Sequence, residues 1–275
     1  MKIAVLISGR AARYEACLLP ILQTTKYDVD LYMSINDESC RYYDKMQIRL
    51  GEWLRGLELA PYDPPEKWVE NINPSTTKQT INGHSHPWNC MSMYYNDMNA
   101  YNMASKTEVE YDVYLKFRSD IITDDFPPVN ITSERTLFSA IPNVASTSPL
   151  SNELGEFTGQ ESEWVCDAIA YGNRESMKDY CDTYNFVVNA NNNSKGQYRI
   201  HFESSLTDSI HHKKLPVEYF KYGYKLDRNR RILDLTWEGS EDNNDSRINN
   251  ITGTANIIDV RSISDIDHIP PDPTI

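Results

Sequence analysis

The chain has 275 residues, of which 40% are hydrophobic and 24% are charged, which suffices for one large α/β domain or two small ones with a buried core. Its formal net charge of -13 argues against a nucleic-acid partner and against adsorption to anionic lipid, because both need a basic surface. A donor diphosphate remains compatible with this charge, since a local arginine and a metal can override the overall field.

The N-terminal stretch, the apolar segments and the cysteines bear on where in the cell the chain is expected. The apolar stretch at the N-terminus is too short for a signal peptide and stops at a polar turn. No window approaches the roughly 18 apolar residues of a membrane span. The 5 cysteines lack the paired spacing of a zinc site, so we expect buried free thiols. These features together predict a cytoplasmic chain.

The first half of the chain alternates strand and helix patterns, which predicts a parallel sheet with right-handed crossovers. The opening apolar run is typical of a central parallel strand. In chain order we expect a strand over 2–7, a helix over 11–24 interrupted at Pro20, a strand over 29–34, an amphipathic helix over 41–59, a long loop over 61–87 and a helix over 89–106.

The second half continues with shorter elements. We expect strands over 111–121 and 136–141, a strand or turn over 165–171, a helix capped by Asn173 and ending near 187, a helix over 202–212 and a late strand or extended segment over 219–226. The fold class is therefore predicted as α/β, with a Rossmann-type, mostly parallel sheet flanked by helices. We expect one domain over 1–238, with halves 1–130 and 131–238, and a loosely packed acidic tail over 239–275.

A turn that follows the first predicted strand is a candidate phosphate site. Backbone N–H groups at a helix start favour phosphate, and Gly9 after Ser8 allows close approach. Arg10 and Arg13 are one helical turn apart, which aims both at a diphosphate. Asn36 ends the second predicted strand and is a further candidate for binding the nucleotide. The alternative for this turn is a simple tight turn.

The sharpest feature is the apolar-alternating run that ends abruptly in Arg118-Ser119-Asp120. Strand ends carry the ligand sites of open α/β sheets. A hard cation such as Mn²⁺ or Mg²⁺ takes one or two carboxylates plus substrate phosphate oxygens, and Asp120 supplies one carboxylate. The alternative is a structural salt bridge at a strand end.

A second acidic site follows further along the chain. Trp164 is a candidate platform for a sugar ring, and Asp167 is placed to act as general base on an acceptor hydroxyl. Glu203 is a further candidate for the acceptor, and His211, on the same face of one predicted helix, for the metal. The alternatives are core packing for Trp164, a hydrogen-bonding role for Asp167 and a solvated pair of histidines at His211.

Six short motifs, taken in their order along the chain, carry a resemblance to a known family. They are Ile7-Ser8-Gly9-Arg10, Val29-Asp30-Leu31-Tyr32 with Asn36-Asp37, Ser92-Met93-Tyr94-Tyr95-Asn96, Lys116-Phe117-Arg118-Ser119-Asp120-Ile121, Asp167-Ala168-Ile169-Ala170-Tyr171-Gly172, and Phe202-Glu203-Ser204-Ser205-Leu206. Over roughly residues 1–228, the chain resembles the small GT-A-type nucleotide-diphospho-sugar glycosyltransferases that large DNA viruses, notably those of algae, encode.

This resemblance implies a GT-A fold, a UDP-sugar donor, Mn²⁺ or Mg²⁺ and a glycan or glycoprotein acceptor. By the same resemblance, Gly9 and Arg10 border the nucleotide, and Asp120 takes the place of the metal-binding Asp-x-Asp motif. Arg118 stands where that motif has its first Asp. The diphosphate charge is then offset either by a metal on Asp120 or directly by Arg118. The resemblance points to a xylosyltransferase that acts on capsid-protein glycans.

The expected activity is an inverting glycosyl transfer with Asp167 as base, and a retaining outcome stays open. Two other functions remain at this stage. One is a non-catalytic glycan- or nucleotide-binding module on the same fold. The other is a virion or host interaction protein that uses the acidic surface and tail.

Overall fold

In the computed structural model, the described residues are 1–9, 14–36, 43–60, 87–123, 125–131, 133–141, 164–196, 198 and 200–226. Residues Met1–Lys225 form one compact unit. Arg10, Arg13, the side chain of Asn36, nearly all of the predicted loop over 61–87 and the predicted tail from 239 lie outside the described residues.

The described elements alternate strands and helices along the chain. In chain order they are β1 (Lys2–Gly9), a π-helical turn (Tyr14–Leu18), α1 (Leu19–Thr24), β2 (Asp28–Asn36), α2 (Tyr43–Arg49), β3 (Leu54–Ala60), α5 (Pro87–Ser105), β4 (Val113–Phe117), β5 (Ile121–Ile122), β6 (Leu137–Ala140), β7 (Ile169–Gly172), α7 (Arg174–Cys181), α8 (Thr183–Asn193), α9 (Phe202–His212), β8 (Val217–Phe220) and β9 (Lys225–Leu226).

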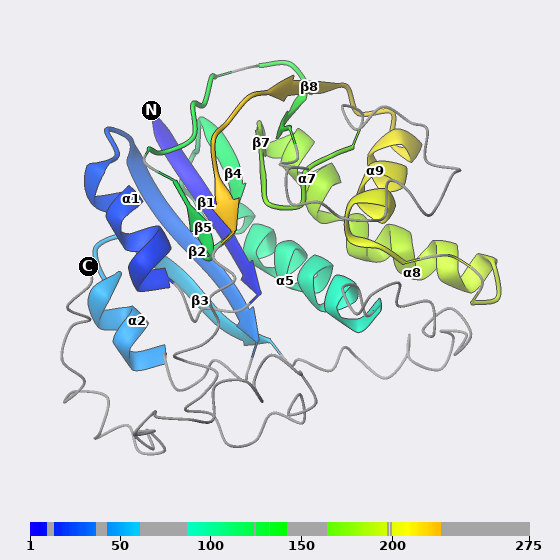
Figure 1. Ribbon diagram of the computed structural model, residues 1–275, viewed down its shortest axis with the longest axis horizontal. Helices are drawn as coiled ribbons and strands as arrows, with labels where there is room; N and C mark the ends of the chain where they lie inside the picture. The colour runs from blue at the N-terminus through cyan, green and yellow to red at the C-terminus, as the bar shows by residue number, and fades with distance from the viewer. Residues whose placement is uncertain are drawn as a thin grey trace, which may run out of the picture. The chain divides into compact units, whose positions relative to one another are not determined.

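The main sheet has seven strands in the order β3-β2-β1-β4-β7-β6-β8. Its strands pair in parallel except β7, which is antiparallel to both of its neighbours. Helices α1 and α2 lie on one side of the sheet and α5 and α7 on the other (Figure 1). The predicted α/β class with a mostly parallel, helix-flanked sheet, as expected of a GT-A-type domain, is therefore confirmed.

The strand order reverses beside the first strand. The chain moves outward from β1 through β2 to β3, and then returns so that β4 pairs with the other side of β1. Open α/β sheets bind ligands at such a switch point, outside the carboxyl ends of the strands. The fold thus directs attention to the ends of β1 and β4, where Gly9 and the segment after Phe117 lie.

Alternation along the strands divides the core into two faces. On β1, Ala4 and Leu6 belong to the large apolar cluster that includes residues of α5, α7, α8 and α9. Tyr32 of β2 and Tyr114 of β4 join the same cluster. Because side chains alternate along a strand, Ser8 and Lys116 also face α5. This face therefore carries polar groups close to the ligand edge of the sheet.

Several helix predictions are confirmed and two are wrong. Asn173 caps α7 by accepting a hydrogen bond from the Ser176 N–H at 2.9 Å, as predicted, and α9 begins and ends where predicted. The predicted helix over 41–59 is wrong in its second half, because α2 ends at Arg49 and β3 pairs with β2. The predicted helix to 187 is divided, since α7 ends at Cys181.

Two sequence expectations concern thiols and membranes. The four described cysteines, Cys17, Cys90, Cys166 and Cys181, are buried and unbridged, as expected. Among the described helices, none combines the length and apolar character needed to cross a bilayer.

Candidate active site

The ends of β1 and β4 meet at the switch point. The parallel register pairs Ile7 with Phe117, so the residues after them in each strand are neighbours. Gly9 has φ +90, and a Cβ built there meets no described atom within 4 Å. The open space and the left-handed backbone explain why a glycine ends this strand, and they leave room for a ligand to approach the main chain.

The side chains of Arg118 and Asp120 form a two-pronged ion pair directly after β4. Arg118 Nε donates to Asp120 Oδ1 at 2.8 Å, and its Nη2 donates to Oδ2 at 2.7 Å. Each side chain keeps 27% of its surface exposed. Burial raises the pKa of Asp120, but the charge and hydrogen bonds of Arg118 outweigh it, and the net shift is downward. Both groups are therefore charged at neutral pH and accessible to a ligand.

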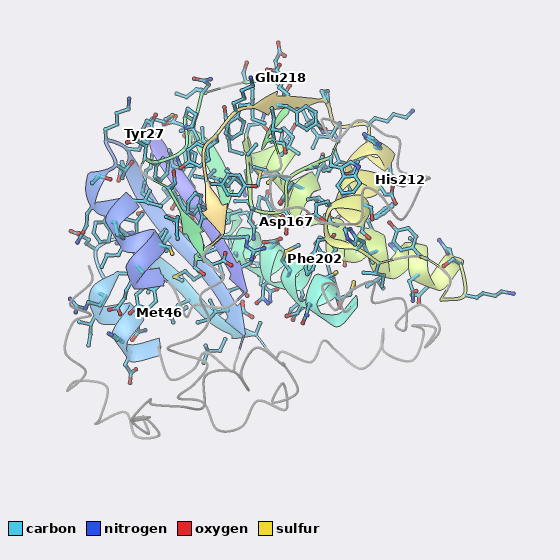
Figure 2. All side chains as sticks on the ribbon, in the orientation of Figure 1. Tyr27, Met46, Asp167, Phe202, His212 and Glu218 are labelled. Atoms are coloured by element: carbon cyan, nitrogen blue, oxygen red, sulfur yellow. The ribbon has the colours of Figure 1, made fainter. Side chains whose placement is uncertain are left out.

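Asp167 reaches the same place because β7 runs against its neighbours. The antiparallel register pairs Phe117 with Ile169, so the residues just before β7 meet those just after β4. Arg118 Nη1 lies 3.4 Å from Asp167 Oδ2. Within the described residues, Asp167 Oδ1 has no hydrogen-bond partner. Asp167 is labelled in Figure 2. Arg118 thus joins two predicted site carboxylates.

The segment that carries Asp167 is held from several elements. The Val165 N–H donates to Thr207 Oγ1 of α9 at 3.1 Å, and the Cys166 N–H donates to Ser139 Oγ of β6 at 2.8 Å. The Tyr180 hydroxyl of α7 donates to the Cys166 carbonyl at 3.0 Å. These three side chains are positioning residues that the sequence reading missed, since they lie far from Asp167 along the chain and no local pattern marks them.

The acceptor candidates gather at the start of α9. The rings of Trp164 and His201 meet edge to face with centroids 6.4 Å apart, and His201 Nδ1 lies 3.4 Å from Glu203 Oε2. Burial raises the pKa of the Cys90 thiol well above its ordinary value, and the charges of Glu203 and then Asp167 add to this rise. The charges of Glu203 and Asp167 therefore both influence the thiol of Cys90, near the start of α5.

A buried ion pair lies next to the carboxyl ends of β1 and β4. Lys116 Nζ donates to Asp97 Oδ1 of α5 and to Ser8 Oγ, and the two charged side chains are 0% and 3% exposed. Burial raises the pKa of Asp97, and Lys116 offsets this only in part. The sequence reading missed this pair, although a lysine that shares the apolar side of β4 with Tyr114 is a signal that the strand pattern contains.

His211 lies far along α9 from Glu203. It is exposed in the last turn of α9, eight residues beyond Glu203, which is about 12 Å along the helix axis. Phe202 and His212 mark the two ends of α9 in Figure 2. The role of His211 as a metal ligand stays a prediction.

The described residues do not fit a divalent metal at Asp120. Each oxygen of Asp120 already accepts a hydrogen bond from Arg118, so Mn²⁺ or Mg²⁺ at this carboxylate would have to share it with the guanidinium and lie beside its positive charge. Within the described part of the chain, no group of three or more His, Cys, Asp or Glu side chains is placed to hold a metal ion by itself, so a metal at Asp120 would depend on oxygens of the substrate. The cation at this point is the guanidinium.

No protein-family model and no curated protein matches the sequence. Solved structures of sugar-transferring enzymes do resemble it. Mouse xyloside xylosyltransferase 1 is 10% identical with a TM-score of 0.42, over 80% of this chain and 85% of its own. The galactosyltransferase LgtC is 11% identical with a TM-score of 0.45, over 80% and 73%. Core-mannan synthase A of Aspergillus fumigatus, in an Mn/GDP form, is 13% identical with a TM-score of 0.46, over 79% and 72%.

Likenesses of this strength do not decide the reaction or the substrate of this chain. The chemistry of the site has to carry that conclusion. An accessible guanidinium at a switch point suits a diphosphate, and a carboxylate beside it suits proton abstraction from a hydroxyl. Together, these groups are suited to displacing a diphosphate leaving group.

Proposed function

We propose that this chain is a GT-A-type glycosyltransferase that moves a sugar from a UDP-sugar to a glycan acceptor. The observation that carries the proposal is the contact of Arg118 with both Asp120 and Asp167 at the switch point between β1 and β4. Switch points bind nucleotides in open α/β sheets, and arginine is suited to a diphosphate.

In the proposed donor site, the diphosphate lies between Gly9 and Arg118. The open backbone at Gly9 lets phosphate oxygens come close, and Arg118 supplies positive charge. Ser8 lies beside them and is held by Lys116. Arg10, Arg13 and Asn36 remain proposed nucleotide contacts from the sequence.

In the proposed reaction, Asp167 takes the proton of the acceptor hydroxyl through Oδ1. The acceptor oxygen then forms a bond to the anomeric carbon, while the bond from that carbon to the β-phosphate oxygen breaks and leaves its electron pair on UDP. A single displacement of this kind inverts the anomeric centre. The bonds from Ser139, Thr207 and Tyr180 keep the segment of Asp167 in place, which lowers the cost of orienting the base.

The proposed acceptor site lies at the start of α9. Trp164 offers a ring face or edge to a sugar, and Glu203 offers an acceptor for a sugar hydroxyl. From the sequence resemblance alone, we propose xylose as the donor sugar, a viral capsid glycan as the acceptor and the host cytoplasm as the setting. The divalent metal that the resemblance implies takes no part in this reaction scheme, because the described residues do not fit it.

A panel of UDP- and GDP-sugars tests the proposal. Binding is measured by calorimetry, and release of the nucleoside diphosphate is measured with oligosaccharide acceptors, each with MnCl₂ and with EDTA. The proposal predicts that one UDP-sugar binds and releases UDP faster when a suitable acceptor is present. If no nucleotide or nucleotide sugar binds under either condition, the enzyme proposal is wrong and the interaction-protein alternative gains.

A further inference from the structure

The cation at Asp120 is already part of the chain. Arg118 uses Nε and Nη2 to bind both oxygens of Asp120, in the parallel fork that arginine makes with a carboxylate. A metal ion that used Asp120 would have to compete with this fork for the carboxylate and lie beside a positive charge. Arg118 also stands two residues before Asp120, where an Asp-x-Asp motif would place its first carboxylate. At this position the chain therefore has a positive charge where that motif would have a metal ligand.

Arg118 keeps bonding capacity for a ligand. Its contacts with Asp120 and Asp167 use three N–H groups, and a guanidinium carries more than three. Its side chain is 27% exposed at the carboxyl edge of the sheet, next to the open backbone at Gly9. Burial lowers the pKa of Arg118 but the charges of Asp120 and Asp167 raise it by more, so the cation stays protonated.

We infer that Arg118 takes the place of the divalent metal, so that the nucleoside diphosphate binds and leaves without one. This inference rests on the proposed function, because it concerns the leaving group of that reaction. The cation is the guanidinium of Arg118, which Asp120 orients and Asp167 partly neutralises.

The contact with Asp167 ties the cation to the reaction coordinate. Before reaction, Arg118 shares its charge between two carboxylates. When Asp167 accepts the acceptor proton, one of those negative charges disappears. The guanidinium is then less compensated at the moment when negative charge develops on the departing diphosphate. Stabilisation that grows in the transition state is the kind that raises kcat.

Calorimetry with UDP on the full chain tests the inference directly. For wild type, we expect the UDP affinity to differ by less than about threefold between EDTA and MnCl₂. R118Q should weaken UDP binding by about 10- to 100-fold in both buffers, since it removes a charged hydrogen-bonding group. R135Q is the matched control, because Arg135 pairs with Asp179 at 2.5 Å and precedes β6. β6 runs in the same direction as β4, so Arg135 lies at the amino end of the strands and Arg118 at the carboxyl end. It should change the affinity by less than about twofold.

Manganese binding without nucleotide gives an independent readout. In R118N, Asp120 and Asp167 lose their cation, and electron paramagnetic resonance should detect a Mn²⁺ site that is absent from wild type and from R118N/D120N. The double variant separates this site from weak binding to the acidic surface.

The outcomes distinguish the two levels of the argument. UDP binding that EDTA abolishes in wild type overturns the inference about Arg118 and leaves the proposed function standing, and this arm needs no variant that must fold. A wild-type Mn²⁺ site that D120N removes also overturns the inference. Absence of UDP binding in both buffers overturns the inference and the proposed function together.

Discussion

Two cations of the β4 region, Lys116 and Arg118, are two residues apart but differ in burial and in role. Lys116 is 0% exposed and pairs with buried Asp97 beneath α5. Arg118 is 27% exposed and pairs with Asp120 at the ligand edge. The pKa of Asp97 is raised because burial dominates, whereas that of Asp120 is lowered because Arg118 dominates. Depth below the surface thus separates a pair that belongs to the scaffold from a pair that can meet a substrate.

The largest effect on folding is expected from breaking the buried pair. Lys116→Met leaves Asp97 buried without its counter-charge, which should lower the free energy of unfolding by about 3–5 kcal/mol. K116M/D97L should recover most of this loss, because a buried pair is replaceable by apolar groups. R118Q should cost less than about 1 kcal/mol. Urea denaturation measures all three, and equal losses for K116M and R118Q would contradict the comparison.

The next effect concerns catalysis. Asp167→Asn keeps the shape of the side chain but removes the base, so turnover should fall at least about 100-fold while UDP binding stays near wild type. The measurement combines a kinetic assay of UDP release with calorimetry. Full activity would remove Asp167 from the mechanism, and lost UDP binding would move it to the donor site.

A smaller effect is expected at the end of β1. Gly9 has φ +90, so Gly9→Ala should destabilise the chain by about 1–2 kcal/mol although no described atom crowds its Cβ. Gly223→Ala is the matched control, since its Cβ also meets open space and its φ is not left-handed. Thermal unfolding of the two variants compares them. A cost shared by both would mean that backbone strain is not the reason for Gly9.

The smallest effect concerns acid pH. The pKa of Asp120 in the fold lies below the ordinary value of 3.8, so its ionised pairing with Arg118 stabilises the fold above that pH and is lost as pH falls through the folded pKa. The stability difference between wild type and D120N should therefore shrink below about pH 4. For Asp97, whose pKa is raised, the sign is opposite. The stability of wild type relative to K116M/D97L should grow as pH falls. Denaturation curves from pH 3 to 6 test both signs.

The strands within residues 1–130 could be predicted from the sequence because their signals are local. Apolar runs that end in polar turns marked β1, β2 and β4, and the cap at Asn173 marked the start of α7. The strand β3 was mistaken for the end of a helix, because its leucines fit a helical period and its pairing with β2 is not a local signal.

The site itself depended on information that the sequence pattern does not hold. Arg118, Asp120 and Asp167 were recognised as candidates, but the contact of Asp167 with Arg118 follows from the antiparallel direction of β7, which no pattern in β7 reveals. The bonds from Ser139, Thr207 and Tyr180 also join distant parts of the chain. Long-range pairing therefore decided how the predicted residues combine.

The most direct test of the central claim is a crystal structure of the full chain grown with both UDP and MnCl₂, with anomalous data at the manganese edge. The account predicts the diphosphate between Gly9 and Arg118, with a phosphate oxygen about 2.7–3.2 Å from the guanidinium and no manganese peak at Asp120. A manganese ion bridging Asp120 and the diphosphate, with Arg118 turned away, would contradict it.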